Sequence, residues 1–489
     1  MSPSPSIAGT AIVWLRRDLR LDDHHALVAA ARASSRIACV FVLDPLLLRG
    51  PRVGAPIVQF FFDSLRVLRE HLQSAGSDLV LLEGECAEQL GALAERLGAT
   101  AVYYNVDDDP AMKQRDEAVA RALRERKIDT HGCIDYVYAG AHDVLQLSGK
   151  PYTVYTPYRK RWQATFEGRR TAPFDSRVAA QRKFISRAEL GVQRDVPHPE
   201  AYGHASSERY PRGGIDEAHR KLDAFLRADV DTYVQRRNLP AVAGTSFLSP
   251  HLRAGTIGIR ACVSAALHVR ALRGKSAVGN IDGWIGELIW RDFYNQLLVH
   301  FPRIAYEPFL EAGKNVPYEH DERRYAAWCE GRTGYPIVDA AMIQLSTTGW
   351  MHNRLRMIVA SFFTKHLMGD YHDGERYFEQ HLADADLAAN NGGWQWSASI
   401  GTDAAPYFRV FNPTMQGKTF DPAGTFVRSM LPVLAKVPTK YVHEPWLLPP
   451  LLAVDAGCVI GRDYPAPIVE HAAARTRAID LYGAALKRR

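Results

Sequence analysis

The sequence predicts an α/β domain built on a doubly wound parallel sheet, a long connector and an all-α domain. Three observations lead to this prediction. The chain has 489 residues, more than one hydrophobic core usually covers. Its first part alternates short apolar runs with helical patterns. After about residue 215 the strand pattern nearly disappears and helical patterns continue alone.

The α/β domain is expected at residues 8–138. Short apolar runs predict strands at Ala11–Leu15, Ile37–Leu43, Asp78–Leu82 and Ala101–Asn105. Apolar residues spaced three and four apart predict helices at Ala26–Ala33, Val58–Leu72, Ala87–Leu97 and Asp116–Arg126. Strands that alternate with helices in this way predict a parallel sheet covered by helices on both faces.

The rest of the chain divides into a connector and a helical domain. Residues 139–214 are dominated by short polar stretches, Pro and Gly, and loops of this length usually carry structure or function of their own. Residues 215–480 are expected to form the helical domain, with helices at Glu217–Leu226, Ile257–Leu272, Ile281–His300 and Arg354–Leu367.

Composition excludes some classes of protein. Hydrophobic residues make up 47% and charged residues 23%, the balance of a folded globular chain. The net charge of +6 is compatible with a polyanionic partner without requiring one. The six cysteines show no C-x-x-C or zinc spacing, which predicts reduced thiols and no metal site. Neither a signal-peptide pattern nor an apolar run of about 18 residues is present, so a cytoplasmic protein is expected.

The segment GWIGELIWRDFYNQLLVH is the first that can carry chemistry. On a helix, Trp284, Glu287 and Arg291 share one face, with Trp290 at its edge. Two indoles, a carboxylate and a guanidinium are costly to bury without partners. An amphipathic helix with an i, i+4 pair between Glu287 and Arg291 explains the pattern equally well.

Two further segments combine polar groups with turn-forming or helical patterns. In GWMHNRLRM, the residues Asn353, Arg356 and Met357 share a helical face, although a helix start with basic surface residues has the same pattern. The segment GTSFLSP offers hydroxyl and backbone N–H groups to a phosphate, and a simple helix cap would look similar.

The stretch HLADADLAANNGGWQW places Asp384 and Asp386 among small residues and glycines. Small residues let a backbone approach a ligand closely. The spacing of the carboxylates does not match an EF-hand, so a calcium loop is not predicted.

Together these segments resemble the photolyase and cryptochrome family. The motifs WLRRDLRLDDH, TSFLSP, ELIWRDFY, TGYPIVDAAM, GWMHNRLRM and DADLAANNGGWQW stand in the family's order, and the resemblance runs from about Ala11 to residue 480. It implies a U-shaped FAD in the helical domain and a second, light-harvesting chromophore at the α/β domain. The implied activity is blue-light-driven repair of cyclobutane pyrimidine dimers in DNA by a monomeric photo-lyase, through an electron from excited reduced FAD.

The resemblance also implies the FAD site. Tyr233 and the loop from Thr245 to Ser249 would hold the phosphates, and Asn390 would face the redox-active ring nitrogen. The full set of implied FAD contacts is Tyr233, Thr245, Ser246, Phe247, Leu248, Ser249, Trp284, Arg356, Asp384, Ala385, Asp386 and Asn390. Hydroxyl and N–H donors suit a pyrophosphate, and Arg356 would supply the cation that a reduced anionic flavin needs.

A lesion must leave the duplex to reach such a flavin, and photolyases are among the enzymes that extrude their target from the base stack. The resemblance implies that Trp290 stacks on the lesion, that Glu287 and Asn353 bind its polar edge and that Met357 makes an apolar contact. Enzymes for the six-four photoproduct carry histidine in this last stretch, so a cyclobutane dimer is expected. The implied DNA contacts are Arg237, Glu287, Trp290, Arg291, Asn353, Arg354, Arg409 and Gln416.

The family's photoreduction chain of three tryptophans is broken here. Trp394 matches the first position, but Tyr371 and Tyr318 stand at the second and third. Tyrosine is harder to oxidise than tryptophan unless its phenol proton has an acceptor. Trp396 and Trp328 offer another path.

The light-harvesting chromophore is expected to be 8-hydroxydeazaflavin or another flavin. Met112 stands where folate-binding members carry a glutamate, which disfavours folate. Asp107 resembles the aspartate of deazaflavin-binding members. A chain without a second chromophore is the other possibility.

A cryptochrome-type blue-light sensor that signals through a protein partner is the alternative function. Such sensors often continue well beyond the helical domain, whereas this chain ends at Arg489. The joint presence of Glu287, Trp290, Asn353 and Met357 favours repair.

Overall fold

The computed structural model describes residues 9–166, 172–192 and 194–487. The chain forms two compact units. The first comprises residues 1–231 and 246–302, and the second comprises residues 232–245 and 303–489.

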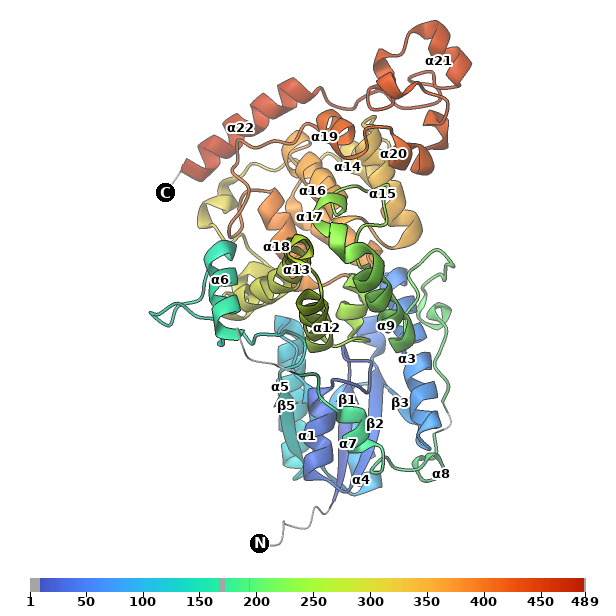
Figure 1. Ribbon diagram of the computed structural model, residues 1–489, viewed down its shortest axis with the longest axis vertical. Helices are drawn as coiled ribbons and strands as arrows, with labels where there is room; N and C mark the ends of the chain where they lie inside the picture. The colour runs from blue at the N-terminus through green and yellow to red at the C-terminus, as the bar shows by residue number, and fades with distance from the viewer. Residues whose placement is uncertain (1–8, 167–171, 193, 488–489) are drawn as a thin grey trace. The chain divides into compact units, whose positions relative to one another are not determined.

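The first unit is built on a parallel sheet, as the sequence predicts, and this sheet has five strands (Figure 1). The strands are β1 (Thr10–Leu15), β2 (Arg36–Leu43), β3 (Leu79–Glu83), β4 (Ala99–Asn105) and β5 (Asp129–Cys133). Their order is β3-β2-β1-β4-β5, so the direction of winding reverses beside β1. In parallel sheets, the crevice beyond the carboxyl ends of the strands at such a switch point is where ligands usually bind.

Helices flank this sheet and continue through the segment expected to be a connector. The helices of the first unit are α1 (His25–Ala33), α2 (Pro45–Leu48), α3 (Ala55–Ser74), α4 (Cys86–Leu97), α5 (Pro110–Glu125), α6 (Tyr155–Phe166), α7 (Ser176–Ala180), α8 (Arg187–Leu190), η1 (Pro199–Tyr202), α9 (Ile215–Ala224), η2 (Phe225–Asp229), α11 (Ser249–Ala254), α12 (Ile259–Leu272) and α13 (Lys275–His300); η3 (Val230–Thr232) lies at the boundary of the units. One core cluster joins α4 and α5 to strands β1, β2 and β4.

The four predicted strands and the predicted helices are present, and the differences have physical reasons. Strand β5 was missed because its sequence, DTHGC, is mostly exposed at the sheet edge and lacks an apolar pattern. Helix α5 begins earlier than predicted because Pro110 stands at its first turn and the Asp109 carboxylate accepts from Ala111 N.

The compact units do not follow the expected boundary at residue 215. Helices α9, α11, α12 and α13 group with the sheet. Part of the reason is electrostatic, because Arg260 of α12 is buried and pairs with Asp23 at 2.8 Å and with Asp135. Burial alone would raise the pKa of Asp135, but Arg20 and Arg260 outweigh it and hold that pKa below its ordinary value.

The second unit is helical. Its elements are α10 (Tyr233–Arg236), η4 (Pro302–Ala305), η5 (Glu311–Asn315), α14 (Glu322–Cys329), α15 (Pro336–Thr348), α16 (Asn353–Ser361), η6 (Phe362–His366), α17 (Tyr371–His381), α18 (Leu387–Ser397), α19 (Pro413–Phe420), α20 (Thr425–Met430), η7 (Pro432–Leu434), η8 (Thr439–Tyr441), η9 (Pro445–Leu447), α21 (Pro450–Ala456) and α22 (His471–Lys487). The helix predicted at Arg354–Leu367 is α16 followed by the π-helical turn η6. The hydrophobic core of the second unit contains the buried side chains of Trp328, Tyr371 and Trp394.

Within the described ranges, no helix combines the length and apolar character that a membrane span requires. The same residues contain no cluster of His, Cys, Asp and Glu arranged to hold a metal ion. The six cysteines are free thiols.

Candidate flavin and lesion site

Helix α13 presents the first group of expected site residues. Trp284 is buried and its Nε1 donates to Ser246 Oγ at 3.3 Å. One turn later Glu287 and Trp290 are half-buried, so both keep a surface that a ligand can reach. The helix therefore joins a buried indole, tied to the hydroxyl-rich loop, to a partly exposed carboxylate and indole.

The loop GTSFLSP has the features of a phosphate cradle. Thr245 Oγ1 is buried and, within the described part of the chain, lacks a hydrogen-bond partner. A Cβ added at Gly244 would lie 2.7 Å from Arg236 Cβ, so the backbone approaches too closely for another residue. Phe247 adopts φ 52°, which is uncommon outside glycine. Since a buried hydroxyl without a partner is costly, this loop fits a polar ligand.

Arg356 and Asp384 form an ion pair in the second unit. Nη2 of Arg356 lies 3.0 and 2.8 Å from the carboxylate oxygens of Asp384, and its Nε donates to Met351 O at 2.9 Å. Asp384 is buried, while a quarter of the Arg356 side chain is exposed. The pair fixes a guanidinium in place and leaves part of it accessible to an anionic group.

Helix α18 orders the next residues of the DADLAANN motif. Asp386 is its N-cap and accepts from Ala389 N at 3.2 Å. Asn390 Nδ2 donates to Glu375 O of α17 at 3.0 Å. Because the amide nitrogen is used in this way, the carbonyl oxygen of Asn390 is the atom left to accept from a donor.

Helix α16 carries Asn353, Arg356 and Met357 on one face, as predicted; Asn353 is exposed and Met357 half-buried. His352, which the sequence reasoning missed, caps this helix, and its Nδ1 accepts from Arg354 N at 3.1 Å. Its position immediately before the helical pattern was the available signal.

His352 lies in a basic cluster. Burial, together with the charges of Arg356, Arg354 and Arg237, lowers the pKa of His352 to about 4. Burial and the charge of Arg237 also lower the pKa of Arg354, whose Nη2 donates to Asn238 Oδ1 at 2.9 Å. Several cations close together are stabilised by a bound polyanion, so this cluster fits a DNA backbone.

The other expected DNA contacts differ among themselves. Arg409 is exposed and half-buried Gln416 has a buried Oε1 that, in the described chain, lacks a hydrogen-bond partner. Arg291 is engaged within the first unit. Its guanidinium donates to the carbonyls of Tyr136 and Leu252 and lies 3.5 Å from the centre of the Tyr136 ring. These contacts favour a structural role for Arg291 over the predicted phosphate contact.

The aromatic residues of the expected electron path do not form one chain. Trp394 and Trp328 are buried, with 6.1 Å between their ring centroids. Tyr371 and Tyr318 are 6.3 Å apart. Among the described residues, no ring contact joins Tyr371 or half-buried Trp396 to Trp394. The structure therefore connects Trp394 to Trp328.

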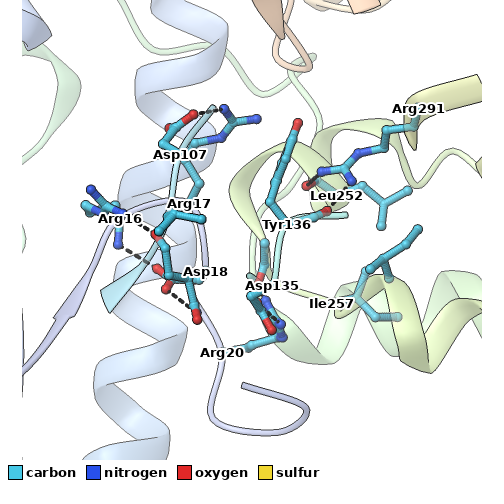
Figure 2. Close-up of a pocket in the computed structure, with 14 residues that line it drawn as sticks. Arg16, Arg17, Asp18, Arg20, Asp107, Asp135, Tyr136, Leu252, Ile257 and Arg291 are labelled. Carbon is cyan, nitrogen blue, oxygen red and sulfur yellow. Dashed lines mark hydrogen bonds and ion pairs between the residues drawn. The ribbon is translucent and has the colours of Figure 1, made fainter. Parts of the chain in front are cut away.

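A small cavity lies at the switch point of the sheet, lined by Asp107, the residue expected at a second chromophore, and by other charged side chains (Figure 2). Arg17 pairs with buried Asp107 at 2.9 Å. The guanidinium carbons of Arg17 and Arg291 lie 3.8 and 3.5 Å from the centre of the Tyr136 ring. Two groups this close to one centroid must occupy opposite faces, and Figure 2 shows Tyr136 between them.

The cavity does not fit a flavin-sized chromophore. Its volume is about 20 Å³, room for about one water, whereas ligand pockets span about 300 Å³ or more. Asp107 is a partner of Arg17, and charges from Arg17, Arg253 and Arg16 outweigh its burial and hold its pKa below the ordinary value. The ion pair with Arg17 disfavours the predicted role of Asp107 as a chromophore ligand.

The expected flavin and lesion residues are divided between the two units. The first contains Glu287, Trp290, Trp284 and the loop from Ser246 to Ser249. The second contains Tyr233, Thr245, Arg356, Ala385, Asn390 and the remaining residues of both sets. Within the first unit Trp284 is bonded to Ser246, and within the second unit Arg356 is paired with Asp384.

Known proteins are similar in sequence to this chain over nearly its whole length. The family described as DNA photolyase matches residues 11–178, and the FAD binding domain of DNA photolyase matches residues 284–484. The deoxyribodipyrimidine photo-lyase of a Synechococcus species is 40% identical over 95% of this chain and 94% of its own length. That of Escherichia coli is 38% identical over 98% of this chain and 99% of its own length.

Solved structures agree with the fold. A class III photolyase from Agrobacterium tumefaciens has a TM-score of 0.88 at 34% identity, covering 99% of both chains. A cryptochrome from Synechocystis has a TM-score of 0.87 at 27% identity, covering 96% of this chain and 99% of its own. An archaeal photolyase from Sulfolobus tokodaii, solved with two FAD molecules, has a TM-score of 0.79 at 30% identity, covering 97% of this chain and all of its own. The chain therefore belongs to the DNA photolyase family and is a FAD-binding lyase of DNA repair.

Proposed function

We propose that this enzyme repairs cyclobutane pyrimidine dimers in DNA under blue light. The observation that carries the proposal is the face of α13 on which Glu287 and Trp290 lie one turn apart, both partly exposed. A base pair inside a duplex cannot reach such a surface, so the dimer must be extruded. The extruded lesion offers a flat apolar face for the indole and polar edges for the carboxylate.

The residues of α16 complete this proposal. Asn353 is exposed and supplies an amide for the polar edge of the pyrimidines, and Met357, one turn later, supplies an apolar contact. The charges of Arg237 and Arg354 attract the flanking phosphates, and exposed Arg409 adds a further contact. Loss of a phosphate contact weakens binding to any DNA, while loss of a pocket residue weakens binding to the lesion.

FAD, bound in its reduced form, supplies the light-driven electron that splits the cyclobutane ring and then returns. The protein's part is to hold it. Thr245 and its neighbouring hydroxyls would donate to the phosphates, and Arg356, anchored by Asp384, would supply a cation. Asn390, with its amide nitrogen committed to Glu375 O, offers its carbonyl oxygen to a ring N–H.

Blue-light sensing through a protein partner is the second candidate, because a Synechocystis cryptochrome shares the fold. The two functions differ in what they require of Trp290. A sensor needs no exposed stacking surface for a lesion, whereas a repair enzyme does. A second chromophore at Asp107 forms no part of the proposal, since the cavity there holds about one water.

The decisive experiment illuminates the holoenzyme, with its flavin chemically reduced, on a duplex containing one thymine cyclobutane dimer. Chromatography of the strands should show turnover in light and none in the dark. A duplex with a six-four photoproduct is the matched substrate and should remain unchanged. Repair of the six-four product, or no repair of the cyclobutane dimer, would contradict the proposal.

The stacking role has its own test. Trp290→Ala should weaken binding to dimer-containing DNA by roughly 1–3 kcal/mol, the usual value of a base–aromatic stack, and affect undamaged DNA less. Equal losses on both kinds of DNA would show that Trp290 has no stacking role.

A further inference from the structure

Helix α6, in the segment expected to be a connector, is clamped onto α13. One face of α6 donates three hydrogen bonds from side chains spaced i, i+4 and i+7: Tyr155 Oη to Gly286 O at 2.6 Å, Arg159 Nη2 to Asp282 O at 3.1 Å, and Trp162 Nε1 to Asp292 Oδ2 at 3.0 Å. Both helices belong to the first compact unit. Helix α6 of the predicted connector thus packs against and stabilises α13, the helix that carries Glu287 and Trp290.

Helix α6 also makes an aromatic contact with Trp290 itself. The rings of Tyr155 and Trp290 are stacked almost parallel, with 3.6 Å between centroids and 7° between planes. Tyr155 is only 8% exposed, whereas Trp290 is half-buried. One face of the indole is therefore covered by a tyrosine that is itself part of the core.

A third ring holds the stacked pair from the side. Phe293 meets Tyr155 edge-on at 5.8 Å and 76°, and meets Trp290 at 5.5 Å and 83°. Phe293 is fully buried. With a face and an edge packed, the indole has little freedom to change rotamer.

We infer that Tyr155 is a positioning residue for lesion recognition, acting through Trp290. Its ring fixes the indole and covers one face, so that an extruded base stacks on what remains exposed. Its hydroxyl holds the ring in register through Gly286 O. A stacking surface fixed before binding spares the ordering cost that a mobile side chain incurs when the lesion arrives. The inference rests on the proposed stacking role of Trp290.

The test compares Tyr155→Leu, which removes the flat ring, with Tyr155→Phe, which keeps the ring and removes the hydroxyl. Affinity of the holoenzyme is measured for a duplex with one cyclobutane dimer and for the same duplex undamaged. Tyr155→Leu should weaken dimer binding about threefold to tenfold and change undamaged binding less than about twofold. Tyr155→Phe should restore most of the lost dimer affinity.

A spectroscopic readout separates positioning from general damage. A 2-aminopurine opposite the dimer becomes fluorescent when the lesion leaves the stack, and Tyr155→Leu should lower that signal at saturating protein. Tyr158→Leu is the matched control, because Tyr158 is also buried on α6 and packs on Phe293, while among the described residues no ring contact joins it to Trp290. The control should lower stability and keep the preference for dimer DNA. If the leucine variant does not fold, Tyr155→Met also removes the ring and fills the gap with a flexible, unbranched side chain.

The inference is overturned if Tyr155→Leu binds dimer DNA like the wild type, if it loses both duplexes equally, or if Tyr155→Phe behaves like Tyr155→Leu. Trp290→Ala distinguishes this failure from that of the proposed function. A Trp290→Ala variant that loses dimer preference beside an unaffected Tyr155→Leu removes only the role of Tyr155. A Trp290→Ala variant that keeps the preference removes the stacking role on which both depend.

Discussion

The indole of Trp394 meets that of Trp328 edge-to-face, with 6.1 Å between centroids and an interplanar angle of 73°. Trp328 is fully buried and its Nε1 donates to Val359 O at 3.2 Å. The next ring outward is that of half-buried Tyr325, 6.2 Å from Trp328. An unbroken aromatic path thus leads from Trp394 toward the surface without Tyr371.

Trp328→Phe should strongly slow photoreduction of the enzyme with oxidised flavin and an external thiol reductant. Tyr371→Phe should change it little, because the Tyr371 hydroxyl has no hydrogen-bond partner in the described chain and burial raises its pKa, so its proton has nowhere to go on oxidation. Trp396→Phe is the matched control and should also change it little. Transient absorption should show a tryptophanyl radical.

In this path the excited oxidised flavin would take one electron from Trp394, and Trp328 would restore that electron to Trp394. The external thiol would then restore Trp328 through half-buried Tyr325, because Trp328 itself is fully buried. A tyrosyl radical that disappears in Tyr371→Phe would instead assign the path to Tyr371. Rapid photoreduction of Trp394→Phe would exclude both paths.

Arg237→Ala and Arg409→Ala should each weaken binding to damaged and undamaged DNA alike. Each should also reduce the slope of log affinity against log salt by about one unit, since each removes one phosphate contact. Arg291→Ala is the contrasting variant: its guanidinium is engaged by Tyr136 and Leu252, so it should lower thermal stability and leave the slope unchanged. If Arg291→Ala also reduced the slope of log affinity against log salt, Arg291 would be a phosphate contact.

Wild-type protein should not bind 8-hydroxydeazaflavin or FMN at the switch point of the sheet, because Tyr136 fills it. Tyr136→Ala should create the space, and titration should then show saturable quenching of the chromophore's fluorescence. Loss of chromophore binding in Asp107→Asn would show that the chromophore binds at the switch point. Wild-type binding that disappears in Asp107→Asn would contradict the prediction, whereas binding unaffected by it would lie elsewhere on the protein.

The stability of the protein should fall as pH falls from about 6.5 to about 4, in part through His352. Its pKa is lowered from 6.5 to about 4 in the folded chain, so in this window the unfolded chain binds a proton that the folded chain does not. Protonation would also remove the acceptor that caps α16. His352→Asn keeps a capping acceptor and should flatten this part of the profile. Equal slopes for both proteins in chemical denaturation would contradict the assignment.

The sequence pattern alone predicts the fold class, which the structure confirms. Parallel strands alternating with helices follow from periodicity, because a strand buried on both faces needs a continuous apolar run, as at Arg36–Leu43. The face shared by Asn353 and Met357 follows from helical geometry alone. The family motifs indicate FAD and DNA repair, and the relatives agree.

Only the tertiary structure decided which partner each side chain takes. The resemblance implies a phosphate contact for both Arg291 and Arg237. In the structure, Arg291 packs on the Tyr136 ring, whereas Arg237 lies in a basic cluster with Arg354. Trp328 is 66 residues before Trp394 and touches it, while Trp396 is two residues away and does not. Periodicity fixes the direction of a side chain within its own helix, but contacts between helices depend on packing that no local pattern contains. For that reason the sequence predicted Trp290 as a stacking residue, and only the packing of α6 on α13 placed Tyr155 against it.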